Sequence, residues 1–307
     1  MLYGTECAAQ PKLPIPADTT QLKQLANGFC FLIANDLGRN GYYDQQPIAD
    51  MMGEVAAIVH PEFVAALGDV HHFMGVQSVN DPLWTTNFER VYSHPELMIP
   101  WYPVLGNHEY RGNTQAVLDY AKVSRRWQMP SRYYSKTVAI NDSVAMLLLF
   151  IDTTPLISKY RKDSTSEASK QTITNQLEWI DSTLAASTAR WKVVMGHHPV
   201  YSGTLKSASE QADLQRLLLP MLDKHGVTAY ICGHIHSYQH IAVPSSSVEF
   251  VVSSSGSLAR EVVSCPGMVA SSAQPGFLVC SATGGSISLA FIGKDGRVLD
   301  RIVRRSR

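Results

Sequence analysis

The sequence has little that would suggest a disulfide-rich or membrane-spanning protein. Its five cysteines are odd in number, widely spaced and without a Cys-x-x-Cys pair: Cys7, Cys30, Cys232, Cys265 and Cys280. This pattern argues against a disulfide framework or a zinc ribbon, because both need paired or closely spaced cysteines. No run of roughly 18 apolar residues occurs, so no segment is expected to span a membrane.

An excess of charge of one sign is also missing. Lys and Arg total 26, and Asp and Glu total 26, so no global field attracts nucleic acid or an anionic membrane. We therefore expect neither as a partner, and any anion must be bound by a local site. The first residues, MLYGTECAAQPKLPIP, lack a basic segment followed by an apolar one, so no intact signal peptide is visible.

What the sequence does contain is ample apolar material, 45% of 307 residues. Short apolar runs alternate with segments of helical period, which is typical of a layered α/β protein. Predicted strands cover residues 29–34, 63–67, 103–105, 145–151, 192–195, 229–232, 250–253, 277–281 and 286–292. Predicted helices cover residues 47–59, 82–92, 114–127, 174–185 and 210–225. The Asp295-Gly296 dipeptide predicts a hairpin turn before residues 298–303.

Five of the predicted strands are each followed at once by a polar cluster. The clusters are Asn35-Asp36, Gly68-Asp69, Gly106-Asn107-His108-Glu109, Gly196-His197-His198 and Gly233-His234-Ile235-His236. Because open α/β sheets bind ligands at the carboxyl ends of their strands, we expect these clusters to meet in one crevice. A single Asp there is commonly a helix cap, and a single His a structural residue. Five such clusters together predict metal binding.

Carboxylate, amide and imidazole ligands without cysteine suit Fe, Zn or Mn rather than thiolate-seeking metals. Two ions about 3.5–4 Å apart clamp the attacking and leaving oxygens of an in-line displacement. We favour Asp69 as the carboxylate that the two ions share. His234 and His236 lie two residues apart, so on an extended segment both rings would point the same way and serve one ion each.

The ordered motifs NDLG, GDVHH, GNHE, GHHP and GHIH resemble those of the calcineurin-like metallophosphoesterases. The stretches GDVHHFMGVQSVND, QLEWIDSTLAA and HGVTAYICGHIH further resemble the small, single-domain purple acid phosphatases of the tartrate-resistant type. The resemblance covers about residues 29 to 303. It implies an α/β fold, a four-layer α/β/β/α sandwich of two mixed sheets flanked by helices. We expect a lead-in over residues 1–28 and one metallophosphoesterase domain over residues 29–307.

The resemblance also implies the ligands of two metal ions. One ion would be held by Asp36, Asp69, His72 and His236, and the other by Asp69, Asn107, His197 and His234. His108 matches the residue that assists departure of the leaving group, with the alternative that it only orients the Asn107 loop. Glu109 is expected to support the site rather than to bind metal.

Position 72 departs from the family pattern. The family motif GDxxY supplies a tyrosinate to ferric iron, whereas this chain has His72 at the Tyr position, so no tyrosinate chromophore is expected. A neutral imidazole brings less negative charge than a phenolate and favours divalent ions, so we expect Fe paired with Fe, Zn or Mn. Alternatively, His72 binds no metal.

Asn35 stands where the family has Gly, and its side chain would bend the strand end or hydrogen-bond to Asp36.

The implied function is hydrolysis of phosphate monoesters by in-line attack of a metal-bound hydroxide, with Asp69, Asn107 and His108 as the catalytic set. A phosphodiesterase or nucleotide hydrolase using the same site, and a degenerate, non-catalytic metal-binding module, remain as alternatives. We expect a small phosphorylated substrate and a monomer, with an oligomer left open. Likeness to exported family members favours a periplasmic or extracellular location. Residues 158–170 and 202–210 are candidate substrate-selecting loops.

Overall fold

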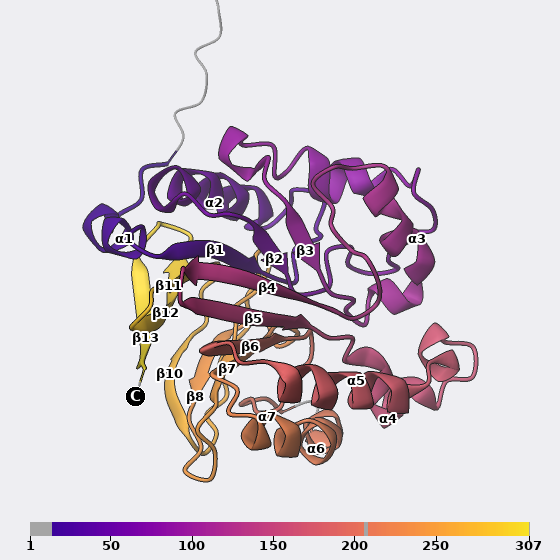
Figure 1. Cartoon of the computed structure of the whole chain (residues 1–307). Coiled ribbons are helices and arrows are strands. Elements are labelled where there is room, and N and C mark those ends of the chain that lie inside the picture. Colours follow the sequence, from indigo (N-terminus) through magenta and orange to yellow (C-terminus); the bar gives the residue numbers. More distant parts are fainter. Residues whose placement is uncertain (1–13, 206–207, 307) are drawn as a thin grey trace, which may run out of the picture.

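The computed structural model describes residues 14–205 and 208–306. In this part of the chain two mixed sheets pack face to face, and helices cover their outer faces (Figure 1). This arrangement confirms the predicted four-layer α/β/β/α sandwich. The larger hydrophobic core lies between the sheets and under the N-terminal helices, and a second core lies under the helices of the later half.

Each sheet combines parallel and antiparallel strands. The first has the order β13 (Val298–Arg305), β12 (Ser286–Gly293), β11 (Gly276–Ala282), β1 (Phe29–Ala34), β2 (Val64–Ala66) and β3 (Trp101–Pro103). The second has the order β10 (Met268–Ser272), β8 (Tyr238–Ile241), β9 (Glu249–Val252), β7 (Ala229–Cys232), β6 (Trp191–Met195), β5 (Val144–Phe150) and β4 (Tyr134–Asn141). Strands β1, β2 and β3 are parallel, as are β5, β6, β7 and β9.

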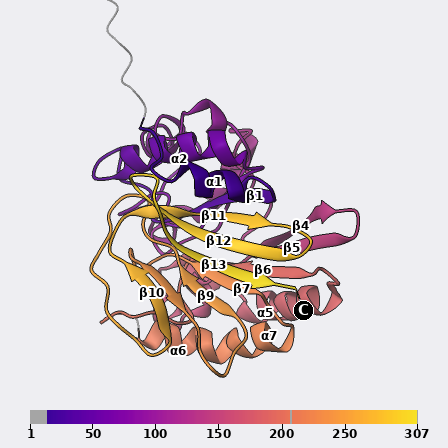
Figure 2. The same ribbon diagram turned by 90° about the vertical axis from the view of Figure 1, so that its left-hand side faces the viewer.

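Helices cover the outer face of each sheet (Figure 2). The first sheet is covered by α1 (Thr19–Leu25) and α2 (Gln45–Val59), and the second by α5 (Ile173–Ala186), α6 (Ala208–Leu217) and α7 (Leu219–Lys224). Shorter helical segments are α3 (Thr114–Asp119), α4 (Ser158–Arg161), a π-helical turn at Trp84–Glu89, and 3-10 turns at Pro95–Leu97, Glu109–Arg111, Tyr120–Lys122, Thr154–Leu156 and Glu167–Lys170.

The burial of each strand explains how well the sequence predicts it. Strand β1 lies in the middle of its sheet with both faces covered, so FCFLIA is a continuous apolar run that is easily recognised. Strands β4, β8 and β10 are missing from the prediction. Two of them, β4 and β10, form the edges of the second sheet, where exposed polar side chains interrupt the apolar pattern.

Three predicted helices are shorter or divided in the structure. The helix predicted at 210–225 splits into α6 and α7, and Pro220 stands in the first turn of α7, where its missing N–H and its ring prevent continuation of the preceding helix. The helix predicted at 82–92 is only the π-helical turn at Trp84–Glu89. The one predicted at 114–127 ends as α3 at Asp119, with one 3-10 turn beyond it.

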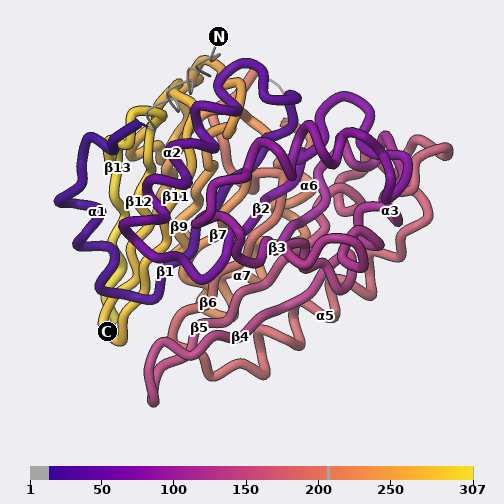
Figure 3. Tube along the Cα trace, turned by 90° about the horizontal axis from the view of Figure 1, so that it is seen from above, coloured from indigo at the N-terminus to yellow at the C-terminus, as the bar shows by residue number. Residues whose placement is uncertain are grey.

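The later part of the predicted lead-in packs against the rest of the fold. Leu22 and Leu25 of α1 are buried in the main core, and the Asp18 carboxylate accepts a hydrogen bond from the Val298 backbone N–H at 2.8 Å. Helix α1 packs against β11, where the Ser281 hydroxyl donates to the Leu25 carbonyl oxygen, and Figure 3 shows this corner of the molecule from above. Residues 1–13 of the lead-in lie outside the described residues, and the division of the chain into domains stays a prediction.

The cysteines of the described residues, Cys30, Cys232, Cys265 and Cys280, are free thiols, and Cys7 lies outside that part of the chain. No described helix combines the length and the apolar composition that a membrane span requires.

Candidate metal centre

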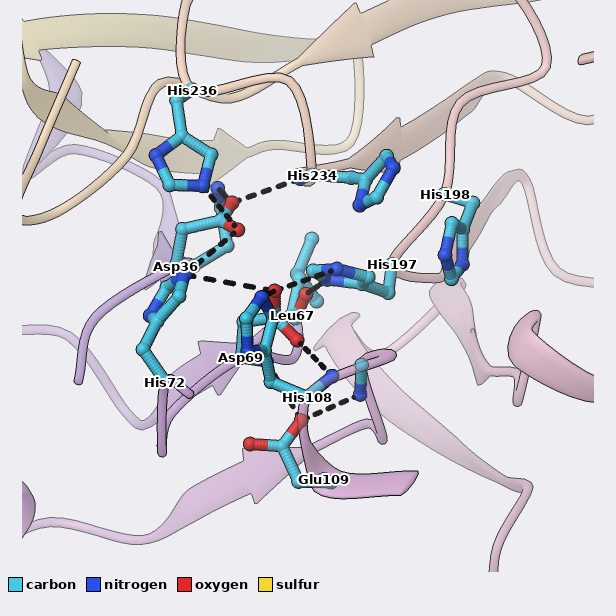
Figure 4. Close-up of polar contacts among 12 residues, drawn as sticks. Asp36, Leu67, Asp69, His72, His108, Glu109, His197, His198, His234 and His236 are labelled. Carbon is cyan, nitrogen blue, oxygen red and sulfur yellow. Dashed lines mark hydrogen bonds and ion pairs between the residues drawn. The ribbon is translucent and has the colours of Figure 1, made fainter. Parts of the chain in front are cut away.

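The predicted clusters converge where the parallel strands of the two sheets end. Asp36, Asp69 and Asn107 follow β1, β2 and β3 of the first sheet. From the second sheet, His197 follows β6, and His234 and His236 follow β7. Figure 4 shows the two carboxylates facing the three imidazoles across the gap between the sheets. The expectation of one shared crevice therefore agrees with the structure.

Four of these residues have a backbone conformation that residues other than glycine rarely adopt. The φ angles of Asp36, Asp69, His234 and His236 are 52°, 53°, 71° and 66°. Such left-handed conformations cost about 1–3 kcal/mol and cluster at functional sites. The prediction of an extended GHIH segment is therefore wrong: the chain turns sharply, and the two rings diverge.

Asp36, His72 and His236 form a first group, whose potential ligand atoms all lie within 4.8 Å of one another. His236 Nε2 lies 3.2 Å from Asp36 Oδ1, and His72 Nε2 lies 3.9 Å from the same oxygen and 3.7 Å from Asp69 Oδ2. Burial lowers the pKa of His72 to about 3, although both carboxylates oppose this shift. The ring is therefore neutral, the form in which imidazole binds a metal.

His197 links the first group to a second one. Its Nε2 lies 3.3 Å from Asp69 Oδ2, while its Nδ1 faces the Leu67 carbonyl oxygen at 2.8 Å. His197 groups with Asp36 and Asp69 on one side and with His198 and His234 on the other. The sequence alone indicates no separate role for His198, which is the second His of GHHP.

Several atoms of these groups are buried without a hydrogen-bond partner among the described residues. They are Asp36 Oδ1, Asn107 Oδ1, His197 Nε2 and both ring nitrogens of His72. Of these, Asp36 Oδ1 and His197 Nε2 have ion-pair contacts with His236 and Asp69, respectively, but no hydrogen bond in this part of the chain. An unpaired buried polar group costs about 1–3 kcal/mol, so such a concentration in one place calls for ligands. Carboxylate, amide and imidazole donors fit two borderline metal ions, which would engage these atoms.

The two aspartates are held ionised. Burial by itself would raise their pKa values, but His236 beside Asp36 and His197 beside Asp69 hold both below the usual range. Burial likewise would lower the pKa of His197, yet the Asp69 carboxylate outweighs it and raises the pKa to about 10. Without metal, His197 is thus a proton-bearing partner of Asp69, and metal binding must displace that proton.

Residues beside the ligands hold the loops in place. Glu109 Oε2 accepts hydrogen bonds from the backbone N–H groups of Asp69 at 2.8 Å and Gly106 at 2.7 Å. Its carboxylate therefore supports the site, as expected. The Asn35 side-chain amide donates to Asp36 Oδ2 at 2.6 Å, which is one of the two roles expected for this departure from the family.

His108 lies at the edge of the crevice. Its backbone N–H donates to Asp69 Oδ1 at 3.0 Å, its Nδ1 faces the Phe73 carbonyl oxygen at 3.1 Å, and its Nε2 lies 3.8 Å from Asp69 Oδ2. It lines a cavity of about 760 Å³ together with Asp69, Asn107, His234, Arg111 and Lys159. Arg260 also lines the cavity, so three cations at this opening can attract an anionic substrate, beside the carboxylates of Glu210 and Glu261.

Comparisons with known proteins identify the family of the chain. Residues 30–238 match the family described as Calcineurin-like phosphoesterase. The chain is 36% identical over 261 residues to purple acid phosphatase 4 of Arabidopsis thaliana, covering 81% of this chain and 74% of that protein. It is 34% identical over 214 residues to tartrate-resistant acid phosphatase type 5 of Oryctolagus cuniculus, covering 68% of this chain and 65% of that protein.

A solved structure described as GAP50, the anchor in the inner membrane complex of Plasmodium, superposes with a TM-score of 0.78 at 22% identity, covering 91% of this chain and 89% of that one. At this identity the likeness shows the fold. The curated relatives confirm the predicted enzyme class, a metal-dependent phosphoric monoester hydrolase, and imply a binuclear metal centre. The chain therefore belongs to the calcineurin-like phosphoesterase family, on the branch of the purple and tartrate-resistant acid phosphatases, and is a metal-dependent phosphatase.

Proposed function

We propose that this phosphatase hydrolyses the monoesters of small phosphorylated molecules by in-line displacement at a two-metal centre. Asp36, Asp69, His72 and His236 would hold one ion, and Asp69, Asn107, His197 and His234 the other. The observation that carries the proposal is the set of buried oxygen and nitrogen atoms that both sheets direct into one crevice and that have no hydrogen-bond partner in the described part of the chain.

Asp69 is the residue best placed to be shared. Its Oδ2 lies 3.7 Å from His72 Nε2 and 3.3 Å from His197 Nε2, which belong to different ligand sets. When bound, the two ions lower the pKa of a coordinated water and neutralise the charge of the phosphate oxygens.

The residues of the chain position the substrate and its leaving group. Arg111 and Arg260 at the cavity wall attract the phosphate. The contact of His108 Nδ1 with the Phe73 carbonyl leaves Nε2 on the side of Asp69. From there a protonated His108 would donate its Nε2 proton to the ester oxygen as the bond to phosphorus breaks, which releases an alcohol and phosphate.

Position 72 supports a proposal for the kind of metal ion. Imidazole in place of phenolate favours a divalent pair, which we propose to be Fe with Fe, Zn or Mn, without a tyrosinate colour. We further propose an exported, monomeric enzyme.

The test is elemental analysis and p-nitrophenyl phosphate hydrolysis on the same preparation, for the wild type, Asn107→Ala and the exposed control Asn80→Ala. We expect two ions in the wild type and the control, and loss of hydrolysis in Asn107→Ala. A wild type that binds neither Fe, Zn nor Mn and releases no phosphate would refute the proposal. Faster hydrolysis of bis-p-nitrophenyl phosphate than of the monoester would instead favour the phosphodiesterase alternative.

A further inference from the structure

The cavity wall beside His234 contains a buried carboxylate, that of Glu210 in α6. The Glu210 side chain is 1% exposed, and its Oε2 lies 3.2 Å from His234 Nε2. Its Oε1 accepts hydrogen bonds from Lys159 Nζ at 2.9 Å and from the Tyr160 hydroxyl at 3.2 Å. Both carboxylate oxygens are therefore paired, as burial of a charge requires.

Donors and acceptors can be assigned in the hydrogen-bond chain that runs from Thr153 through His198 and Tyr160 to Glu210. Thr153 Oγ1 accepts from the backbone N–H groups of His197 and His198 at 3.3 and 3.1 Å, so its own proton points to His198 Nδ1 at 2.9 Å. His198 then carries its proton on Nε2, 3.3 Å from the Tyr160 oxygen. Because the Tyr160 oxygen accepts a hydrogen bond from His198 Nε2–H, the Tyr160 hydroxyl hydrogen is free to donate to Glu210.

A carboxylate without a proton can only accept hydrogen bonds, so the His234 nitrogen that faces Glu210 must carry a hydrogen. In a neutral imidazole the other nitrogen then holds the lone pair. For His234 this nitrogen is Nδ1.

We propose that Glu210 is a positioning residue that holds His234 in the tautomer protonated at Nε2 and so presents Nδ1 to the second metal ion. The inference rests on the proposed function, because it needs a second ion at His234. The proposal also assigns a second role to the two candidate substrate loops, residues 158–170 and 202–210. Lys159 and Tyr160 from one loop and Glu210 from the other together fix the orientation of a metal ligand.

Glu210→Gln tests this role. Glutamine has one acceptor oxygen, whereas donors face both oxygens of Glu210, so either the His234 contact or the contacts to Lys159 and Tyr160 must be lost. Partners of metal-binding histidines typically contribute 10- to 100-fold to metal affinity. We expect the affinity for the second Zn²⁺ ion, measured by chelator competition, to fall by about that factor while the first ion is unaffected.

Glu249→Gln is the matched control. Glu249 Oε2 lies 2.9 Å from His240 Nε2, and its Oε1 accepts from Arg304 at 2.8 Å. This pair has the same chemistry as Glu210 and His234, but His240 belongs to neither ligand set. We expect unchanged affinity for both zinc ions in this variant.

The tautomer is measured directly by ¹⁵N NMR of the histidine rings in the metal-free wild type, with the His234 signal assigned by its loss in His234→Gln. The expected result is a protonated Nε2 and a bare Nδ1, which shifts when zinc is added. If Glu210→Gln does not fold, Tyr160→Phe removes a single donor to Glu210 and should weaken the second site in the same direction.

A proton on His234 Nδ1, or unchanged second-site affinity in a folded Glu210→Gln protein that binds two zinc ions, would overturn this inference and leave the proposed function intact. Absence of a second zinc ion from the wild type would overturn the proposed function itself.

Discussion

His197 Nε2, just after β6 of the second sheet, lies 3.3 Å from Asp69 Oδ2, just after β2 of the first. The contact joins the two sheets at the crevice, and the Leu67 carbonyl holds the His197 ring in this orientation. The metal centre therefore depends on how the sheets are packed as well as on which residues end their strands.

Asp69→Asn should weaken both metal sites, because Asp69 Oδ2 faces a ligand of each. We expect the affinity for both ions to fall more than about 100-fold, which exceeds the loss typical of a residue that only hydrogen-bonds to a metal ligand. Phosphatase activity should be lost as well. Zinc titration of the variant beside the exposed control Asp142→Asn measures this. Loss of one ion with the other held at wild-type affinity would show that Asp69 is not shared.

His108→Ala should slow hydrolysis without releasing metal, because His108 acts on the leaving group. For an alkyl phosphate we expect kcat to fall roughly 10²- to 10⁴-fold, the range of general acid catalysis. The loss should be much smaller for p-nitrophenyl phosphate, whose phenolate departs without a proton. His60→Asn, which changes an exposed histidine, serves as control. Equal losses on both substrates would point instead to a role in orienting the Asn107 loop.

His72→Tyr should give the iron-loaded, oxidised protein a visible charge-transfer band. The ring at position 72 lies beside oxygens of Asp36 and Asp69, where a phenolate would reach the first ion. Absorption spectra of the wild type, His72→Tyr and His72→Phe provide the comparison, and only the Tyr variant should be coloured. A colourless Tyr variant with two bound ions would mean that position 72 binds no metal.

Asp152→Asn should change how stability depends on pH. Burial raises the pKa of Asp152 to about 7, although the Tyr110 hydroxyl donates to its carboxylate and lowers it. Since the folded pKa lies above the unfolded value of 3.8, this residue's stabilisation is complete below about pH 4 and is lost as pH rises through 7. The Asn side chain of the variant cannot ionise, so the variant does not lose this stabilisation as the pH rises.

The stability of the Asp152→Asn variant relative to the wild type should therefore rise between pH 4 and 8, by about 4 kcal/mol at most. Urea unfolding of the metal-free proteins at several pH values measures the difference. A difference that does not vary with pH would show that Asp152 stays ionised in the fold.

Much of the site could be predicted because its signals are local. An apolar run such as that of β1, followed directly by Asp36, identifies both a buried strand and the polar residue at its end. Edge strands such as β4 lack this signal, since one face meets solvent and polar residues are tolerated there. The sequence places Glu210 only at the end of a candidate loop, because nothing between it and His234 shows that the two residues meet.

By itself, the sequence determined the layered α/β fold, the family and the residues that end the central strands, because apolar period and residue chemistry are properties of short segments. Only the tertiary structure decided which atoms face one another: the contact of His197 with Asp69, the left-handed backbone at His234 and His236, and the pairing of Glu210 with His234. These contacts join residues far apart in the chain, so they form only when packing of the two sheets brings their strand ends together.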